Sequence, residues 1–186
     1  MKTKIPIETK DYFLTQESFS LIKTKGLDVY KTTPRIKKEA IGKYYKSTKY
    51  LSHNNNKSLF SILYWLVKRF NFYFKYRVLK TVSDNDKSLL DFGSGNAYFV
   101  SQLKKRGFPA VAYDPFYDSV LNKTINDDKV LKDEKSLISA KFNTVTMWHS
   151  LEHVFSYKDT LSLISEILIS KGCLLYTSDA ADDGLS

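Results

Sequence analysis

The sequence of 186 residues predicts an α/β fold built on a parallel sheet. Two observations carry this prediction. Between residues 88 and 170, short apolar runs of strand length alternate with longer segments that have helical periodicity. A Gly-x-Gly turn follows the first of these runs, at the strand-to-helix position where ligands bind in such sheets. With 42% hydrophobic residues, the chain is long enough for one domain with a core, or for one domain plus a small appendage.

The N-terminal residues 1–56 form a basic, Tyr-rich leader. Residues 11–34 mix aromatic and β-branched residues around a break at Lys25-Gly26, which predicts a short hairpin followed by a turn at Pro34. Residues 57–82 then place apolar side chains at helical spacing. This spacing predicts a long amphipathic helix that covers the following domain, with a candidate break near Asn71.

Residues 83–172 contain the alternating elements. We expect strands at SLLDFG, AVAYD and FNTVTMWH, with a less defined strand near KVLK. We expect helices at NAYFVSQLKKRG, closed by Gly107, near YDSVLNKTI, and at YKDTLSLISEILIS, which stops at Lys171-Gly172.

The formal net charge of +9 is unevenly distributed, because the residues up to 87 are strongly basic and the remainder is slightly acidic. No segment near Met1 resembles a signal peptide, and the longest apolar run, residues 59–67, is too short to span a bilayer. We therefore expect a cytoplasmic protein. Cys173 is the single cysteine, so we expect neither a disulfide framework nor a thiolate metal site, and no bound metal.

The last segment, CLLYTSDAADDGLS at residues 173–186, changes abruptly to small and acidic residues. It resembles the translation of a transposase sequencing-library adapter. This interpretation predicts that the authentic chain ends near Gly172 as a fragment and that Cys173 is not native. The alternative is a natural strand, CLLYTS, followed by an acidic tail.

The glycine loop indicates which kind of cofactor the domain binds. A dinucleotide fingerprint needs a small residue at its third position, where this sequence has the bulky Tyr98. The pattern that fits is D-x-G-x-G-x-A, from Asp91 to Ala97. The Asp91 carboxylate would repel a pyrophosphate but suits a cofactor with a cationic end. S-adenosylmethionine has an ammonium group, a sulfonium and no phosphate.

A second acid supports the same cofactor. Asp114 ends the strand AVAYD and follows Gly93 by 21 residues, close to the spacing at which a carboxylate accepts hydrogen bonds from ribose hydroxyls. Either acid alone is better explained as a helix cap or turn residue. Two acids and two glycines together, each at a strand end, favour a cofactor site.

The stretches LLDFGSGNAYFVSQLKKRGFPAVAYDP and FNTVTMWHSLEHV resemble the class I S-adenosylmethionine-dependent methyltransferases, in particular the group whose fourth strand ends in W-H-x-L-E-H-V. The resemblance extends from about Leu89 to Gly172. It implies a Rossmann-like sheet of about seven strands, of which the chain supplies about the first four. It also implies a cofactor-binding set of Asp91, Gly93, Gly95, Asn96, Asp114, Trp148 and His149.

Within this set, the resemblance implies that the two glycines let the backbone approach the cofactor. Asp91 then orients the amino-acid end of the cofactor, Asp114 holds its ribose, and Trp148 and His149 lie beside the methyl donor. Asp133 is a candidate for the acid that contacts adenine. The chain departs from the family pattern at Ala97, Tyr98 and Asn143, and at Lys23 and Lys25, where some relatives have paired cysteines.

His149 and His153 are the candidates for a base that accepts a proton from the methyl acceptor, because imidazole titrates near neutrality. The alternatives are that His149 packs against the cofactor and that His153 starts the next helix. Glu152 is explained by stabilisation of the N-terminus of that helix.

Two features that the sequence lacks limit the classes of methyl acceptor. No [N/D]-P-P-[Y/F] motif follows the fourth strand, and no native cysteine is expected that would attack a pyrimidine. We favour a small-molecule acceptor with an oxygen or nitrogen nucleophile over nucleic acid, and we retain contact with an anionic membrane as an alternative. Further alternatives are a lipid- or RNA-directed methyltransferase and a truncated, non-catalytic α/β module.

Overall fold

A computed structural model describes residues 6–12, 15–24, 30–37, 59–115, 130–131 and 133–177. The chain divides into two compact units, Met1–Asn54 and Asn55–Ser186. The helix expected near residues 117–125 lies outside the described residues.

The N-terminal unit contains a three-stranded antiparallel sheet in the order β1-β2-β3. Its strands are β1 (Ile7–Lys10), β2 (Ser18–Lys23) and β3 (Tyr30–Thr33). The pairing of β2 with β3 confirms the predicted hairpin. Strand β1 was not predicted, because all four of its residues are exposed and its sequence lacks an apolar face. A hydrogen bond from Ser20 Oγ to the Glu8 carboxylate, 2.9 Å long, joins it to β2.

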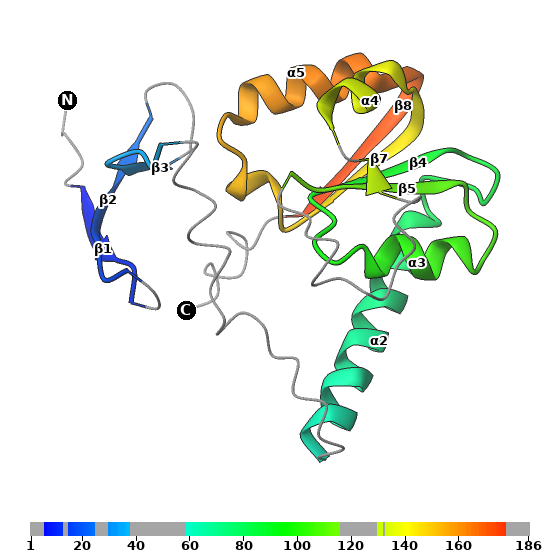
Figure 1. The fold of residues 1–186 in the computed structure, drawn as a ribbon, viewed down its shortest axis with the longest axis horizontal. Helices are drawn as coiled ribbons and strands as arrows, with labels where there is room; N and C mark the ends of the chain where they lie inside the picture. Colours follow the sequence, from blue (N-terminus) through cyan, green and yellow to red (C-terminus); the bar gives the residue numbers. More distant parts are fainter. Residues whose placement is uncertain are drawn as a thin grey trace. The chain divides into compact units, whose positions relative to one another are not determined.

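The second unit is built on a five-stranded parallel sheet in the order β6-β5-β4-β7-β8 (Figure 1). The strands are β4 (Leu89–Phe92), β5 (Ala110–Tyr113), β6 (Val130–Leu131), β7 (Phe142–Trp148) and β8 (Leu168–Thr177). This arrangement confirms the predicted Rossmann-like α/β fold. The strand order reverses between β4 and β7, so a crevice is expected at their carboxyl ends.

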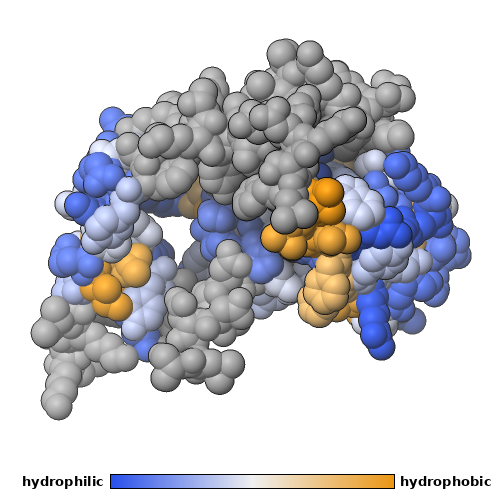
Figure 2. All heavy atoms as spheres, turned by 90° about the horizontal axis from the view of Figure 1, so that it is seen from below, coloured by the Kyte–Doolittle hydropathy of each residue, from blue (hydrophilic) through white to orange (hydrophobic). Residues whose placement is uncertain are grey.

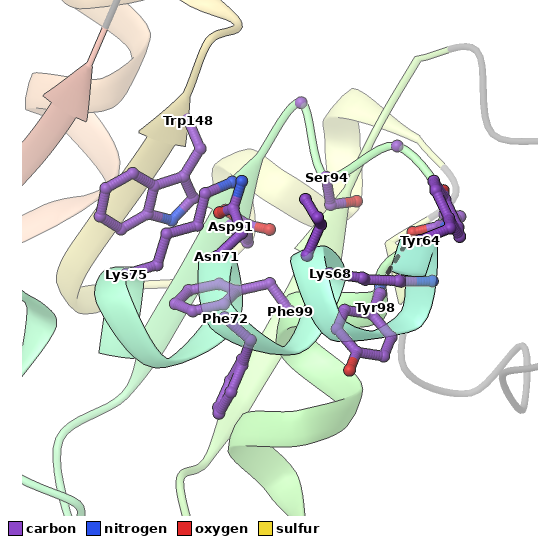
Figure 3. Close-up of a pocket in the computed structure, with 14 residues that line it drawn as sticks. Tyr64, Lys68, Asn71, Phe72, Lys75, Asp91, Ser94, Tyr98, Phe99 and Trp148 are labelled. Carbon is purple, nitrogen blue, oxygen red and sulfur yellow. Dashed lines mark hydrogen bonds between the residues drawn. The ribbon is translucent and has the colours of Figure 1, made fainter. Parts of the chain in front are cut away.

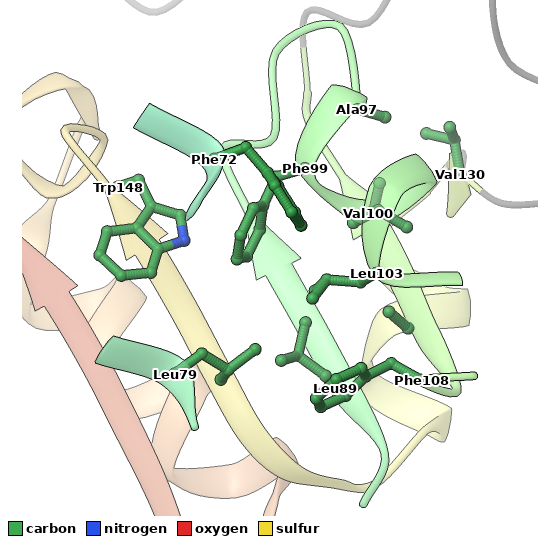
Figure 4. Packing of buried hydrophobic residues seen from close by; sticks show 12 residues of the cluster. Phe72, Leu79, Leu89, Ala97, Phe99, Val100, Leu103, Phe108, Val130 and Trp148 are labelled. Carbon is green, nitrogen blue, oxygen red and sulfur yellow. The ribbon is translucent and has the colours of Figure 1, made fainter. Parts of the chain in front are cut away.

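Helices cover both faces of this sheet (Figure 1). Helices α2 (Leu59–Leu79) and α3 (Tyr98–Lys104) lie on one face, and α4 (Glu134–Ser139) and α5 (Tyr157–Ile167) on the other. Two hydrophobic clusters fill the spaces between the layers. In the first, Phe72 and Leu79 of α2 meet Leu103 of α3 and Trp148 of β7 (Figure 4). Burial of each such side chain stabilises the fold by about 1.5–3 kcal/mol.

Two helices differ from the sequence expectations. Helix α2 continues through Asn71 without a break, with Phe72 buried one residue later. Helix α4 was not predicted, because its six residues are too few to show a periodicity. Asp133 caps it, with its Oδ1 accepting a hydrogen bond of 2.7 Å from the Ser136 N–H.

The boundary between the last helix and the last strand also differs from the prediction. Helix α5 stops at Ile167 instead of residue 170, and β8 begins at Leu168. The change is explained by pairing with β7, which places Leu168 opposite Phe142 and Thr177 opposite Trp148. The sheet therefore has five strands where four were expected. Residues 173–177 lie within β8, as the alternative interpretation of the tail expects, and the adapter origin of the tail stays a prediction.

Candidate functional site

A pocket of about 380 Å³ lies at the carboxyl ends of β4 and β7, beside α2 and α3 (Figure 3). One wall is formed by the glycine loop that follows β4, and the opposite wall by one side of α2. The lining residues are Tyr64, Val67, Lys68, Asn71, Phe72, Lys75, Asp91, Gly93, Ser94, Gly95, Asn96, Tyr98, Phe99 and Trp148.

The glycine loop is held tightly against the sheet. The N–H groups of Gly93 and Ser94 both donate to the Tyr113 carbonyl, at 2.8 and 3.2 Å. Gly93 has a φ of 75°, and a Cβ added there would lie 2.5 Å from the Ser150 Cβ. Gly95 has a φ of 55°, but a Cβ there would meet nothing within 4 Å. Gly93 therefore permits close packing inside the protein, whereas Gly95 leaves open backbone at the pocket.

Two departures from the family pattern lie at the start of α3. Ala97 is fully buried and has a left-handed φ of 52°, so alanine takes the conformation that glycine adopts more easily. The next N–H, from Tyr98, donates to Asn96 Oδ1 at 3.2 Å. A third departure, Asn143, joins β7 to the residue before β4, since its Oδ1 accepts hydrogen bonds from the N–H and Oγ of Ser88 at 3.1 and 2.8 Å.

Asp91 is the buried acid of the site. Its side chain is only 3% exposed, and Oδ1 accepts a 2.7 Å hydrogen bond from Thr146 Oγ1. Burial raises the pKa of Asp91 to about 7, although the Thr146 hydrogen bond and the positive charge of Lys75 both oppose the increase. A cationic ligand group placed beside this carboxylate would stabilise its charged form.

Two lysines of α2 face the pocket, and the sequence analysis did not single them out. Lys68 Nζ lies 4.0 Å from the centre of the Tyr98 ring, and Lys75 Nζ lies 5.2 Å from the centre of the Trp148 ring. Burial lowers the pKa of both lysines, and Asp91 partly offsets the decrease for Lys75. Figure 3 shows the Lys75 side chain directed toward Asp91. The pocket thus presents positive and negative groups side by side.

Asp114 joins the end of β5 to the glycine loop. Its Oδ2 accepts a 2.8 Å hydrogen bond from the Gly95 N–H, and the residue is half-buried. Asp114 does not line the pocket itself, but it fixes the backbone of a residue that does.

Trp148 and Ser94 have polar atoms that are suited to a ligand. The indole ring of Trp148 is 8% exposed and meets the edge of Phe99, with ring centres 5.7 Å apart. Trp148 Nε1 and Ser94 Oγ are buried and have no hydrogen-bond partner among the described residues. Buried donors without a partner are costly, so a polar ligand in this pocket would compensate for both.

Of the seven predicted cofactor-binding residues, five line the pocket, namely Asp91, Gly93, Gly95, Asn96 and Trp148. Asp114 does not line the pocket but accepts a hydrogen bond from the N–H of Gly95, which does. His149 is exposed, has a φ of 52°, and does not line the pocket; its N–H donates to the Thr177 carbonyl at 3.1 Å.

The remaining candidates lie elsewhere. Asp133 is fixed as the cap of α4, and Glu152 and His153 are exposed residues of the short 3-10 helix η3 (Leu151–His153). Among the described residues, no cluster of three His, Cys, Asp or Glu side chains is placed to hold a metal ion.

The sequence contains one feature that relates to the α2 residues lining the pocket. Lys68, Asn71 and Lys75 form a polar stripe at i, i+3 and i+7 on a helix that is otherwise largely apolar. Such a stripe fits a solvated helix face as well as side chains that face a polar cavity, so the sequence alone does not decide between them.

Comparisons with solved structures find methyltransferases at low sequence identity. Coclaurine N-methyltransferase, bound to N-methylheliamine and SAH, is 16% identical with a TM-score of 0.44, and the alignment covers 53% of this chain and 32% of that one. The S-adenosylmethionine-dependent methyltransferase of Mesorhizobium loti is 12% identical with a TM-score of 0.45, covering 56% and 53%. The glycopeptide N-methyltransferase MtfA is 14% identical with a TM-score of 0.47, covering 60% and 56%. The chain thus spans from about a third to just over half of the length of these proteins.

No protein of curated function matches the sequence. The family model described as a methyltransferase domain matches residues 63–185, which is most of the chain and includes the glycine loop, both acids and Trp148. The chain therefore belongs to the methyltransferase-domain family.

Proposed function

We propose that the pocket binds S-adenosylmethionine and that the chain is the cofactor-binding part of an enzyme that transfers a methyl group to an oxygen or nitrogen of a small molecule. The observation that carries this proposal is the placement of Asp91 and Asp114 at the ends of the neighbouring strands β4 and β5, on either side of the glycine loop. The pocket volume of about 380 Å³ lies within the range of small-molecule sites.

Asp91 and Lys75 suit the amino-acid end of the cofactor, which is a zwitterion. We assign the ammonium group to the buried Asp91 carboxylate and the carboxylate group to Lys75, with Lys68 as a second cation on the same side of α2. Trp148 Nε1 and Ser94 Oγ add two donors that have no partner among the described residues. The Asp91 carboxylate lines the pocket and would repel a pyrophosphate placed beside it.

Asp114 suits the ribose. A carboxylate accepts several hydrogen bonds at once, so the bond from the Gly95 N–H is compatible with further bonds from ribose hydroxyls. The same bond holds the loop in position for the cofactor, which makes Asp114 both a binding and a positioning residue in this proposal.

S-adenosylmethionine supplies a methyl group on a sulfonium; in the transfer, a C–O or C–N bond forms, the C–S bond breaks, and the acceptor loses a proton. Positioning and exclusion of water provide much of the rate in such a displacement. The chain contributes the buried wall of Phe72, Phe99 and Trp148 to that exclusion. His149 directly follows Trp148 and is exposed, and we propose it as the group that accepts the proton.

Calorimetric titration of S-adenosylhomocysteine tests this function with two matched variants. Asp114→Ala is expected to weaken binding by about 1–3 kcal/mol, because buried ribose hydroxyls lose their acceptor. Asp84→Ala removes a carboxylate whose side chain is 77% exposed and which does not line the pocket, and it is expected to leave the affinity unchanged. Equal affinities of wild type and Asp114→Ala would refute the assignment of Asp114. Titration of an intact homologue distinguishes the family's function from the competence of this shorter chain.

A further inference from the structure

Helix α2 exposes a continuous apolar face on the side opposite the sheet. This outward face comprises Leu63, Leu66, Phe70 and Phe74, whose exposed fractions are 58%, 50%, 76% and 60%. Their spacing of three to four residues places them on one side of the helix. Phe72 and Leu79, which point the other way, are buried. The outward face is therefore separate from the surface with which α2 packs on its own domain.

The outward face lies on a projecting part of the domain. In Figure 1, α2 extends well beyond the sheet that its C-terminal turns cover. Figure 2 looks at the molecule from below, toward this extension, and shows strongly apolar side chains gathered there. Exposed apolar groups of this kind mark surfaces that bind another molecule.

Cations and amphipathic rings border the outward face. The Arg69 guanidinium lies 5.3 Å from the Trp65 ring centre and 5.4 Å from the Tyr73 ring centre, and Nη2 donates to Tyr73 Oη at 3.2 Å. Arg77 lies exposed on the last turn. The sequence of α2 contains no acidic residue. Tryptophan and tyrosine favour the boundary between lipid and water, and arginine pairs with phosphate groups.

We propose that the outward face of α2 docks on the surface of an anionic lipid bilayer. A second copy of the chain fits less well, because pairing two such faces would bring basic side chains together with no acid on either helix. Among the described residues, no helix is long and apolar enough to cross a membrane. The helix therefore lies in the plane of the bilayer surface, with its apolar side chains inserted at the headgroup boundary.

This docking surface does not depend on the proposed function. Six residues of α2 line the pocket, and none of the four outward-face residues is among them. A result against vesicle binding would therefore leave the proposed cofactor binding untouched, and a result against cofactor binding would leave the proposed docking surface untouched.

Sedimentation of the full chain with vesicles tests the proposal. Vesicles of phosphatidylcholine with added phosphatidylserine are expected to bind the chain, more weakly as salt increases, and vesicles of phosphatidylcholine alone much less. Phe70→Ser combined with Phe74→Ser is expected to lower the partition coefficient by about tenfold or more. Arg69→Gln and Arg77→Gln are each expected to lower it about fivefold. Ile138→Ser, which removes an apolar side chain 42% exposed on α4, serves as the matched control.

Tryptophan fluorescence provides a second test of the proposal that does not require the double phenylalanine variant to fold. The chain has two tryptophans, so Trp148→Phe leaves Trp65 of α2 as the only reporter. Brominated lipids are expected to quench Trp65. Absence of quenching, binding that is indifferent to lipid charge, or sedimentation unaffected by the α2 variants would overturn the proposal. Dimerisation of the chain that these variants abolish, measured by light scattering without lipid, would assign the face to a second copy instead.

Discussion

A Cβ atom placed on Gly93 would lie only 2.5 Å from the Cβ of Ser150. The two residues belong to the two motifs of the family resemblance, the glycine loop and the W-H-S-L-E-H-V stretch. Ser150 is buried and donates from Oγ to the Phe92 carbonyl at 2.9 Å, which closes the contact between the ends of β4 and β7. The missing side chain at Gly93 is therefore what allows one motif to pack on the other.

Gly93→Ala and Gly95→Ala form a matched pair that tests this contact. Both positions have a positive φ, but only Gly93 has a neighbour that the new methyl group would strike. We expect Gly95→Ala to lower the free energy of unfolding by about 1 kcal/mol and Gly93→Ala to lower it by about 3 kcal/mol or more. Urea denaturation measures both. Similar losses in the two variants would show that Ser150 does not limit the space at Gly93.

The buried Asp91 should make stability depend on pH. Its pKa is raised from 3.8 to about 7, so the folded chain binds more protons than the unfolded chain between these values. The titration of Asp91 is therefore expected to lower the free energy of unfolding by about 4 kcal/mol as the pH increases from about 4 to about 7. Asp91→Asn should remove this component, as measured by urea denaturation across the pH range. Parallel pH profiles of the wild type and the variant would contradict the burial of an ionisable group there.

Lys75 should tune the titration of Asp91. Its positive charge lowers the pKa of Asp91, so Lys75→Gln is expected to raise that pKa and to move the pH-dependent loss of stability to higher pH. Lys68→Gln is the control, because Lys68 also faces the pocket but lies beside Tyr98. The Asp91 carboxyl resonance, followed by NMR during a pH titration, reports the midpoint directly. A shift in the Lys68 variant equal to that in the Lys75 variant would show that the effect is not specific to Lys75.

Substitutions of two neighbouring residues test whether β8 is part of the folded sheet. Leu175 packs against the cluster that contains Trp148, whereas Tyr176 is 54% exposed. Leu175→Ala is expected to lower the free energy of unfolding by about 2 kcal/mol, and Tyr176→Ala by less than about 1 kcal/mol. Equal effects would mean that residues 173–177 are not part of the folded sheet, as the adapter hypothesis would allow.

The parallel sheet was predictable because its strands are buried on both faces. The four residues of β4 are all buried, so a continuous apolar run with one acid identifies the strand from local sequence alone. Helix α5 was placed correctly at its start, where Ser156 caps it by accepting a hydrogen bond from the Asp159 N–H. Its end was wrong, because the choice between helix and strand at Leu168 depends on pairing with β7.

The candidate site was predictable in its glycine loop and acids but not in its α2 wall. The acids follow strands, and strand ends meet at one edge of a parallel sheet. Lys68 and Lys75 lie on a helix on which lysines are usually solvated, and only the positions of the Tyr98 and Trp148 rings show that they face inward. His149 directly follows β7, as the sequence predicted, but the motif did not indicate that it is exposed and does not line the pocket.

Titration of the chain with S-adenosylhomocysteine and, separately, with NAD at about pH 8 tests the central claim most directly, because Asp91 is then ionised. We expect one molecule of S-adenosylhomocysteine to bind per chain and NAD not to bind, since the carboxylate attracts an ammonium group and repels a pyrophosphate. Binding of NAD without binding of S-adenosylhomocysteine would contradict the account.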